Sequence, residues 1–383
     1  MLHKLNQNDY PRVRDLFAVL TASQPMCNAV LEGVYPGAVY VDDPARPRTG
    51  YLQTFIGGEQ EPQWGFLAGD PANDAFHADL NRALFGREII HPEAPLVFCT
   101  CDSPDWVPAL EAVFAPSPLI PTPRRHYLAR EFGQDWRAAI PEGFVVEPLD
   151  PSLLQRPGLS VPDEVRQTLA KWERLAGPRF GDYGFVAIDA SPRAARVAAW
   201  ATVDFVAGGM GDLGMFTLDD YRRRGLAYLT TAAAIDHGLS HGMQQICGTC
   251  MEDNPGSIRT AERLGLERVE DYTMYLLVFD PVEAQSMLAY SHLEAGRTAE
   301  ALSMLEGIIA SGKEFPPYVL FDAARARALL GDKDAALAHL MAMAERGSRN
   351  TAPFEECPEF EALRELPGWQ EFIRKVRENG KDK

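Results

Sequence analysis

The stretch Tyr221-Arg222-Arg223-Arg224-Gly225-Leu226-Ala227 places three consecutive arginines between a strand-like run and a helix-like run. Apolar residues at spacings of three and four from Leu226 predict the helix, with Gly225 and the arginines in its first turn. Cations there oppose the helix dipole at ~0.3–1 kcal/mol each, and a glycine costs about 1 kcal/mol against alanine. Both costs are explained if unpaired N–H groups and arginines bind an anion. The alternative is a solvated basic turn balanced by Asp219 and Asp220.

A second motif follows further along the chain. Asn254 is a good helix N-cap and Pro255 suits the first helical position. Gly265 ends this helix, and Leu266 enters another strand. Residues 213–266 therefore predict the order strand, arginine loop, helix, strand, Asn, helix, Gly.

The two motifs together carry a resemblance. Arg222-x-x-Gly225-x-Ala227 resembles the Arg/Gln-x-x-Gly-x-Gly/Ala pyrophosphate loop of the GNAT acetyltransferases, and Asn254 and Ser257 fall at the spacing of that superfamily's next motif. The resemblance implies an N-acetyltransferase. Such an enzyme moves an acetyl or acyl group from acetyl-CoA, its co-substrate, to an amine of a small molecule by direct attack, without a metal.

The resemblance also implies which residues hold the co-substrate. Main-chain N–H groups of residues 223–228 suit the diphosphate, and the strand at 215–217 would hydrogen-bond the pantetheine arm. Asn254 would contact that arm, and its role as a helix N-cap stands beside this one. The implied cofactor-binding residues are Met215, Phe216, Thr217, Arg222, Arg223, Arg224, Gly225, Leu226, Ala227, Tyr228, Asn254 and Ser257.

The chain departs from the family at the proton donor. Many members carry a Tyr seven residues after the Asn, where this sequence has Ala261. Tyr272 is our candidate acid, with Tyr228 or a water as alternatives, and a thiolate is also a fair leaving group without help. Glu252 is the candidate general base, with Asp253 and Asp204 as alternatives. Each carboxylate is equally explained as a solvated or capping group.

Three domains are predicted, at residues 1–133, 143–280 and 281–383. The middle domain follows the GNAT order of elements. The first parallels that order but lacks the arginine loop, which predicts tandem GNAT-like mixed sheets (α/β, α+β) with a degenerate N-terminal half. This pair resembles the two-part acetyltransferases related to the zwittermicin A self-resistance type; a mixed α+β domain of separate origin is the alternative. We expect strands at 32–42, 50–56, 96–101, 126–132, 144–148, 183–188, 196–206, 213–218 and 245–250. We expect helices at 74–85, which residues 64–67 precede, and at 106–114, 165–175 and 255–264.

The last domain is rich in Ala and Leu, and this pattern predicts helical hairpins. Gly296 recurs as Gly331, an offset of 35 residues that the flanking Ala/Leu patterns share. This period resembles tetratricopeptide (TPR) hairpins, although a plain α-hairpin appendage is also consistent with it. Helical repeats indicate a possible protein partner. They also leave open a second function class, a non-catalytic CoA-sensing or peptide-binding interaction protein.

The overall charge and the cysteines limit partners and location. A net charge of −17 argues against nucleic acid and against anionic membrane surfaces. The six cysteines in 383 residues do not make a disulfide framework, and we see neither a secretory start nor a membrane-spanning run. We therefore expect a cytoplasmic protein. Cys247 and Cys250 would lie on opposite faces of a strand, so one metal ion could not contact both. Together with His237 and His241 they therefore do not predict a metal site.

Overall fold

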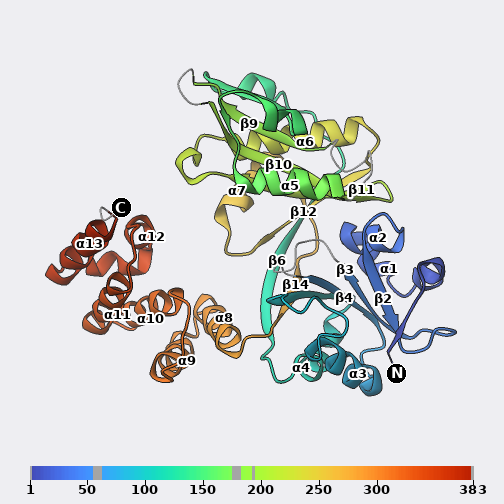
Figure 1. The fold of residues 1–383 in the computed structure, drawn as a ribbon, viewed down its shortest axis with the longest axis horizontal. Helices are drawn as coiled ribbons and strands as arrows, with labels where there is room; N and C mark the ends of the chain where they lie inside the picture. The colour runs from blue at the N-terminus through green and yellow to red at the C-terminus, as the bar shows by residue number, and fades with distance from the viewer. Residues whose placement is uncertain (1, 55–62, 175–182, 192–194, 381–383) are drawn as a thin grey trace. The chain divides into compact units, whose positions relative to one another are not determined.

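The computed structural model describes residues 2–54, 63–174, 183–191 and 195–380. These residues belong to two compact units (Figure 1). The first unit is drawn from residues 1–113 and 122–274, and the second from residues 114–121 and 275–383. The mixed α/β architecture with C-terminal helices, expected from the sequence, is confirmed.

The strands form one hydrogen-bonded series in the order β1-β2-β3-β4-β5-β14-β6-β12-β11-β10-β9-β7. Two neighbouring pairs, β4 with β5 and β11 with β12, run parallel. Of the short strands, β13 pairs with β6 and β8 with β10. The bounds are β1 His3–Lys4, β2 Gly37–Val41, β3 Thr49–Thr54, β4 Gln63–Gly69, β5 Leu96–Cys101, β6 Ile120–Ala129, β7 Phe144–Pro148, β8 Leu159–Ser160, β9 Phe185–Asp189, β10 Ala195–Ala207, β11 Met210–Thr217, β12 Gln245–Met251, β13 Glu267–Arg268 and β14 Tyr272–Val278.

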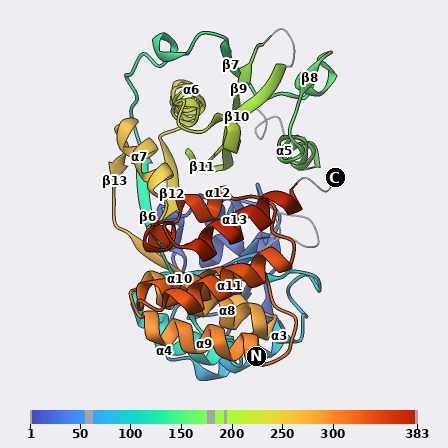
Figure 2. The same ribbon diagram turned by 90° about the vertical axis from the view of Figure 1, so that its left-hand side faces the viewer.

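Helices cover both faces of β9, β10 and β11, with α6 on one side and α5 on the other (Figure 2). On the α6 side, Leu213 and Met215 pack against Leu229. On the other side, Trp200 of β10 belongs to a core cluster with Trp172 of α5. Because side chains alternate along a strand, the odd-numbered residues of β11 face α6 and the even-numbered ones face α5. The helices up to α7 are α1 Ala18–Ser23, α2 Pro25–Leu31, α3 Asp74–Phe85, α4 Val107–Phe114, α5 Asp163–Arg174, α6 Leu226–Ser240 and α7 Pro255–Arg263.

Several expected elements have the bounds read from the sequence. The helix at 74–85 and the strands at 96–101 and 144–148 agree to the residue. The structure also shows an N-cap for α3, where the Asn73 side chain accepts a hydrogen bond from Phe76 N at 3.2 Å. Residues 55–56 of one expected strand and 175 of one expected helix lie outside the described residues. The same holds for residues 192–193, which connect the expected strands at 183–188 and 196–206.

The expected strand at 32–42 is wrong in its first part. Only Gly37–Val41 forms a strand, because α2 extends to Leu31 and Gly33 then turns the chain with φ of +69°. The helices α1 and α2 were not expected. All seven residues of α2 are buried, so it lacks the polar face that gives a helix its periodic signature.

The second unit is a row of helices (Figure 1). Their bounds are α8 Pro281–Glu294, α9 Thr298–Ala310, α10 Tyr318–Leu329, α11 Lys333–Glu345, α12 Ala352–Glu356 and α13 Pro367–Asn379. The expected glycine turns are confirmed: Gly296 precedes α9 with φ of +74° and Gly331 precedes α11 with φ of +82°. Glycine adopts this left-handed backbone without steric cost, which is why it closes each hairpin.

One guanidinium links three segments of this unit. Arg325 of α10 contacts Glu294 of α8 at 2.8 Å, Glu359 at 2.6 Å and Asp322 at 3.2 Å. Its side chain is only 14% exposed. Burial raises the pKa of Asp322 to about 6, although Arg325 favours the ionised form. The ion-pair network is therefore largely desolvated.

Candidate active site

The first feature of the candidate site is the place where two parallel strands part. β11 pairs with β12 from Met210 to Leu213, the last pair being Leu213 with Gly248. Beyond it, β11 continues beside β10 to Thr217, while β12 continues beside β6 to Met251. We call this divergence the fork. It leaves one edge of β11 after Leu213 without its β12 neighbour.

The arginine loop leads from β11 into α6. The sequence predicted that the arginines and Gly225 open the helix, and the structure corrects this: α6 begins at Leu226 and Gly225 is its N-cap, with φ of +77°. Arg223 is also left-handed, with φ of +61°. The loop thus avoids the expected cost of a glycine inside a helix. Successive N–H groups of a turn that contains left-handed residues can form a concave surface that binds an anion.

The charges of the loop are mostly solvent-exposed. Arg222 pairs with Asp219 at 2.8 Å, as the alternative of a balanced basic turn predicted. Arg224 lies over the Tyr221 ring at 5.2 Å and donates to the Asp220 carbonyl at 3.3 Å. Exposed pairs of this kind contribute little stability. The guanidinium groups therefore remain accessible to an anionic ligand.

The first turn of α6 is fixed by contacts on its inner side. Leu226 is buried, and the Tyr228 hydroxyl donates to Gln134 Oε1 at 2.8 Å. Arg263 of α7 lies over the Tyr228 ring at 4.1 Å. A Cβ added to Gly225 would come 3.3 Å from Arg263 Nη1. The Tyr228 hydroxyl proton is already engaged, which disfavours this residue as the acid.

The second motif forms the predicted cap. Asn254 Oδ1 accepts a hydrogen bond from Ser257 N at 3.1 Å, at the start of α7. Ala261, which replaces the family's tyrosine, is buried against Tyr127 and Cys250. This position is therefore filled by core packing and offers no hydroxyl.

The comparison with known families decides the class. The sequence model of the GNAT acetyltransferase family matches residues 16–275, well over half of the 383 residues. The chain belongs to the GNAT acetyltransferase family. It is therefore an acyltransferase, and the N-acetyltransferase class expected from the arginine loop is confirmed.

This GNAT acetyltransferase is similar to the uncharacterized N-acetyltransferase YdfB of Bacillus subtilis, at 24% identity over 252 residues, which are 64% of this chain and 88% of YdfB. Among solved structures it is similar to a GCN5-related N-acetyltransferase-like protein from Streptococcus suis. That match has 20% identity and a TM-score of 0.46, and covers 70% of this chain and 98% of the other. A tandem GNAT protein from the clavulanic acid biosynthesis pathway matches with 16% identity and a TM-score of 0.49, over 73% and 99%.

A polar cluster lies on the α5 side of the fork in this GNAT protein. Asp204 of β10 is directly opposite Asp212 of β11. Asp204 accepts hydrogen bonds from Trp172 Nε1 at 2.8 Å and Thr202 Oγ1 at 3.2 Å, and pairs with Lys171 Nζ at 3.3 Å. Its charge is thus compensated by a lysine. We named Asp204 from the sequence only as an alternative base, and this neighbourhood indicates a structural role.

Asp212 has different surroundings. It is half-buried and lies one residue before the last paired residue of the fork. Burial and the neighbouring Asp204 carboxylate raise the pKa of Asp212 to about 7, while Arg124 and Lys171 oppose the rise. A carboxylate with this pKa can accept a proton near neutral pH. Sequence reasoning missed Asp212, although strand alternation from Leu213 could have placed it on the face away from α6.

The two candidate catalytic residues from the sequence lie in different settings. Glu252 is exposed, just beyond the end of β12. Tyr272 is half-buried at the start of β14, with its ring edge-on to His126 at 6.2 Å. Burial raises the pKa of Tyr272, which Arg124 and Thr249 oppose. Arg124 donates to Thr249 Oγ1 at 3.0 Å, so Tyr272 lies beside the β6 and β12 side of the fork.

Metal ligands and membrane spans were searched over the described residues. Within them, no three His, Cys, Asp or Glu side chains are grouped as a metal ion would require. Cys247 and Cys250 lie in separate clusters, as their strand spacing predicted. No helix of the described ranges is both long and apolar enough to cross a bilayer.

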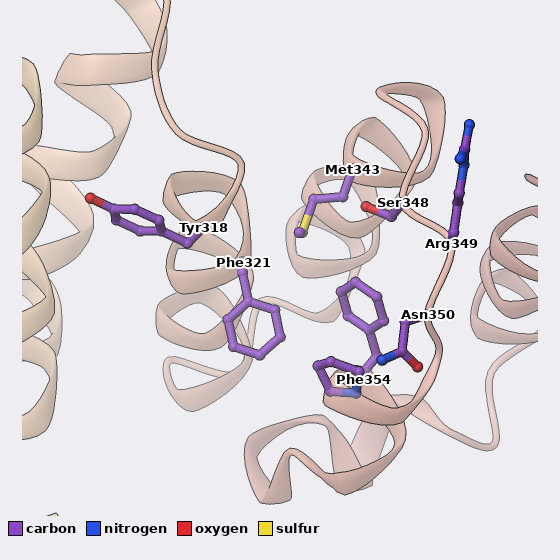
Figure 3. Close-up of a pocket in the computed structure, with 8 residues that line it drawn as sticks. Tyr318, Phe321, Met343, Ser348, Arg349, Asn350 and Phe354 are labelled. Carbon is purple, nitrogen blue, oxygen red and sulfur yellow. The ribbon is translucent and has the colours of Figure 1, made fainter. Parts of the chain in front are cut away.

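The helical unit has a pocket of its own, with a volume of about 330 Å³. Phe321 of α10, Met343 of α11 and Phe354 of α12 point toward a common space, and residues 348–350 form one wall (Figure 3). The pocket is therefore built mainly from apolar side chains of three successive helices.

Proposed function

We propose that the protein transfers an acetyl group from acetyl-CoA to an amine of a small molecule by direct attack. The observation that carries this proposal is the left-handed pair Arg223 and Gly225, which leads from the fork into the N-terminus of α6. A helix N-terminus preceded by such a loop suits a diphosphate, because its first N–H groups lack intrahelical acceptors. Three exposed arginines beside it add positive charge.

The co-substrate would lie along the fork. Main-chain groups of residues 223–228 and the three arginines would hold the diphosphate. The edge of β11 at Met215, Phe216 and Thr217, from which β12 has diverged, would hold the pantetheine arm. Asn254 and Ser257 would contact the same arm from the start of α7.

Asp212 is the base that we favour for the transfer. The incoming ammonium gives one proton to the Asp212 carboxylate, and the nitrogen lone pair then forms the C–N bond with the thioester carbonyl carbon. The C–S bond breaks, and the second nitrogen-bound proton passes to the departing thiolate, with Tyr272 as the relay. Glu252 stays the alternative base. Glu252 is exposed to solvent, whereas Asp212 is half-buried.

Two glycine variants test the loop. Gly225 and Gly242 both have left-handed φ, +77° and +97°, and they lie at opposite ends of α6. A side chain at either position costs ~1–2 kcal/mol of stability. We expect Gly225→Gln to weaken acetyl-CoA binding at least tenfold in isothermal titration, or about 1.4 kcal/mol, and Gly242→Gln to leave it unchanged. Equal affinities would contradict the loop assignment, and a wild-type protein that binds no acetyl-CoA would end the proposal.

We also propose that the helical unit, with its 35-residue offset between Gly296 and Gly331, is of the TPR type and binds a protein partner. The apolar pocket of Figure 3 supports this, since it suits an apolar side chain from an extended peptide. Replacing Met343 by glutamine should abolish binding of the protein partner to this pocket, and the affinity for acetyl-CoA should stay the same. A loss of both would count against a separate binding role.

The division into domains 1–133, 143–280 and 281–383 also enters the proposal. Its support is that β4, α3 and β5 repeat the order of β11, α6 and β12, each with a parallel strand pair around its helix. This repetition favours a protein of two GNAT-like halves. We propose that it is related to the two-part acetyltransferases of the zwittermicin A self-resistance type. Free thiols on all six cysteines support the cytoplasm as its location.

A further inference from the structure

Two large apolar side chains are exposed just beyond the fork. Phe216 is 42% exposed and Met251 is 40% exposed. Each lies three residues after the last paired residue of its strand, Leu213 in β11 and Gly248 in β12. The two side chains therefore occupy equivalent positions on strands that are moving apart.

Both side chains share a face with Asp212. Phe216 stacks on Trp200 at 4.7 Å, and Trp200 belongs to the core cluster on the α5 side. Met251, Thr249 and Cys247 are two residues apart along β12, so their side chains lie on the same face. Cys247 packs against Met210 of β11, and Met210 is two residues from Asp212 and shares its face. An apolar patch and a titrating carboxylate thus lie along one face of the diverging strands.

Gly214 separates the carboxylate from the patch. It is exposed, and a Cβ there would come 3.1 Å from Thr202 Oγ1. Four residues of strand place the Cα atoms of Asp212 and Phe216 about 13 Å apart. A ligand could lie over Gly214 with one end at each residue, since no side chain rises between them.

We propose that the acceptor is a primary monoamine on an apolar body, of the arylalkylamine kind, with its ammonium at Asp212 and its ring against Phe216 and Met251. This inference rests on the proposed acetyl transfer and specifies its substrate class. The direct polar contacts favour a single positive charge, because Lys171 pairs with Asp204 at 3.3 Å and Asp212 is the one carboxylate of the pair without that direct contact. A polyamine would need more acidic groups than this face provides.

The charged and titratable groups around Asp212 come from five elements. They are Lys171 of α5, Asp204 of β10, Arg124 of β6, Cys247 of β12 and Tyr272 of β14, together with Tyr35, which follows α2. Of these, Asp204 raises the pKa of Asp212, and Arg124 and Lys171 lower it. An ammonium bound beside Asp212 favours its ionised form, so binding and proton acceptance occur at one group.

The test compares amines that differ only in their apolar body. CoA release is followed with acetyl-CoA and phenethylamine, methylamine or spermidine as the acceptor. We expect the wild-type protein to prefer phenethylamine, and Met251→Ala to lower kcat/KM for phenethylamine at least tenfold, with less than a twofold change for methylamine and in the KM of acetyl-CoA. Val145→Ala, an exposed apolar residue on β7, is the matched control and should change none of these values.

The outcomes separate this inference from the function on which it rests. A best rate with spermidine, an equal loss for methylamine and phenethylamine, or a raised KM for acetyl-CoA alone would overturn the substrate class. The last result would assign the patch to the co-substrate. Failure of the wild-type protein to bind acetyl-CoA in titration would instead refute the transferase proposal itself.

Discussion

Replacing Asp212 by asparagine removes the titrating carboxylate of the fork and keeps its size. We expect the D212N protein to gain stability relative to the wild-type protein as the pH rises from 5 to 8. Folding raises the pKa of Asp212 from its ordinary value of 3.8 to about 7, because of burial and of Asp204. The folded chain therefore binds this proton more tightly than the unfolded chain. The resulting stability is full below pH 4 and is lost as the pH rises to about 7.

The size of the effect follows from the shift. Each pKa unit corresponds to about 1.4 kcal/mol, so ionising Asp212 in the folded protein costs at most about 4 kcal/mol above pH 7. About 1.7 kcal/mol of this cost is already present at pH 5. The difference between pH 5 and pH 8 is then about 2.5 kcal/mol, and solvent access to this half-buried group reduces it to about 2 kcal/mol.

Urea denaturation at pH 5 and pH 8, followed by tryptophan fluorescence, measures this difference. Five of the six tryptophans lie in the first unit, so the signal reports mainly on the unit that contains Asp212. Asp163→Asn is the matched control, since its side chain is 90% exposed and the same chemical change should have no pH-dependent effect. With any accepted amine, we expect D212N to lose about 100-fold in kcat.

A stability difference between D212N and wild type that is the same at both pH values would refute the raised pKa. Full activity in D212N would refute the catalytic role but leave the pKa argument standing. The two measurements therefore test separate steps of the reasoning. A variant that is more stable at pH 8 but inactive would mean that this site is maintained at the expense of stability.

Two further predictions concern other residues. Tyr272→Phe should lower kcat about 100-fold without changing acetyl-CoA affinity; a change below twofold in steady-state kinetics would remove Tyr272 as the acid. Arg325→Leu should lower the free energy of unfolding of the helical unit by about 3–5 kcal/mol, because it leaves Asp322, Glu294 and Glu359 without their shared cation. Urea denaturation followed by circular dichroism checks this, and a loss under 1 kcal/mol would contradict it.

The sequence predicted local structure well where a cap or a turn carries the signal. The Asn254 cap, the turns at Gly296 and Gly331, and the bounds of α3 follow from interactions within a few residues. The error at Gly225 is also local. The sequence cannot distinguish a glycine in the first turn of a helix from a glycine at the N-cap. The φ angle of Gly225 distinguishes the two positions.

The carboxylate cluster could not be predicted in the same way. Its members are joined by packing between elements: Lys171 comes from α5, Asp204 from β10 and Arg124 from β6. Nothing in the sequence near Asp212 indicates that a lysine compensates Asp204 and leaves Asp212 to titrate. The α2 helix escaped prediction for a related reason, since a helix buried on every side has no polar stripe to mark its period.

The guanidinium of Arg325 has a consequence for how the helical unit melts. Stacked hairpins that touch only their neighbours can fray from one end, each with its own midpoint. Here a single cation joins a carboxylate of the first hairpin, Glu294, to one near the C-terminal end, Glu359. If either end unfolded alone, it would remove a carboxylate partner from the buried Arg325 guanidinium. We therefore expect the helical unit to unfold in one cooperative step.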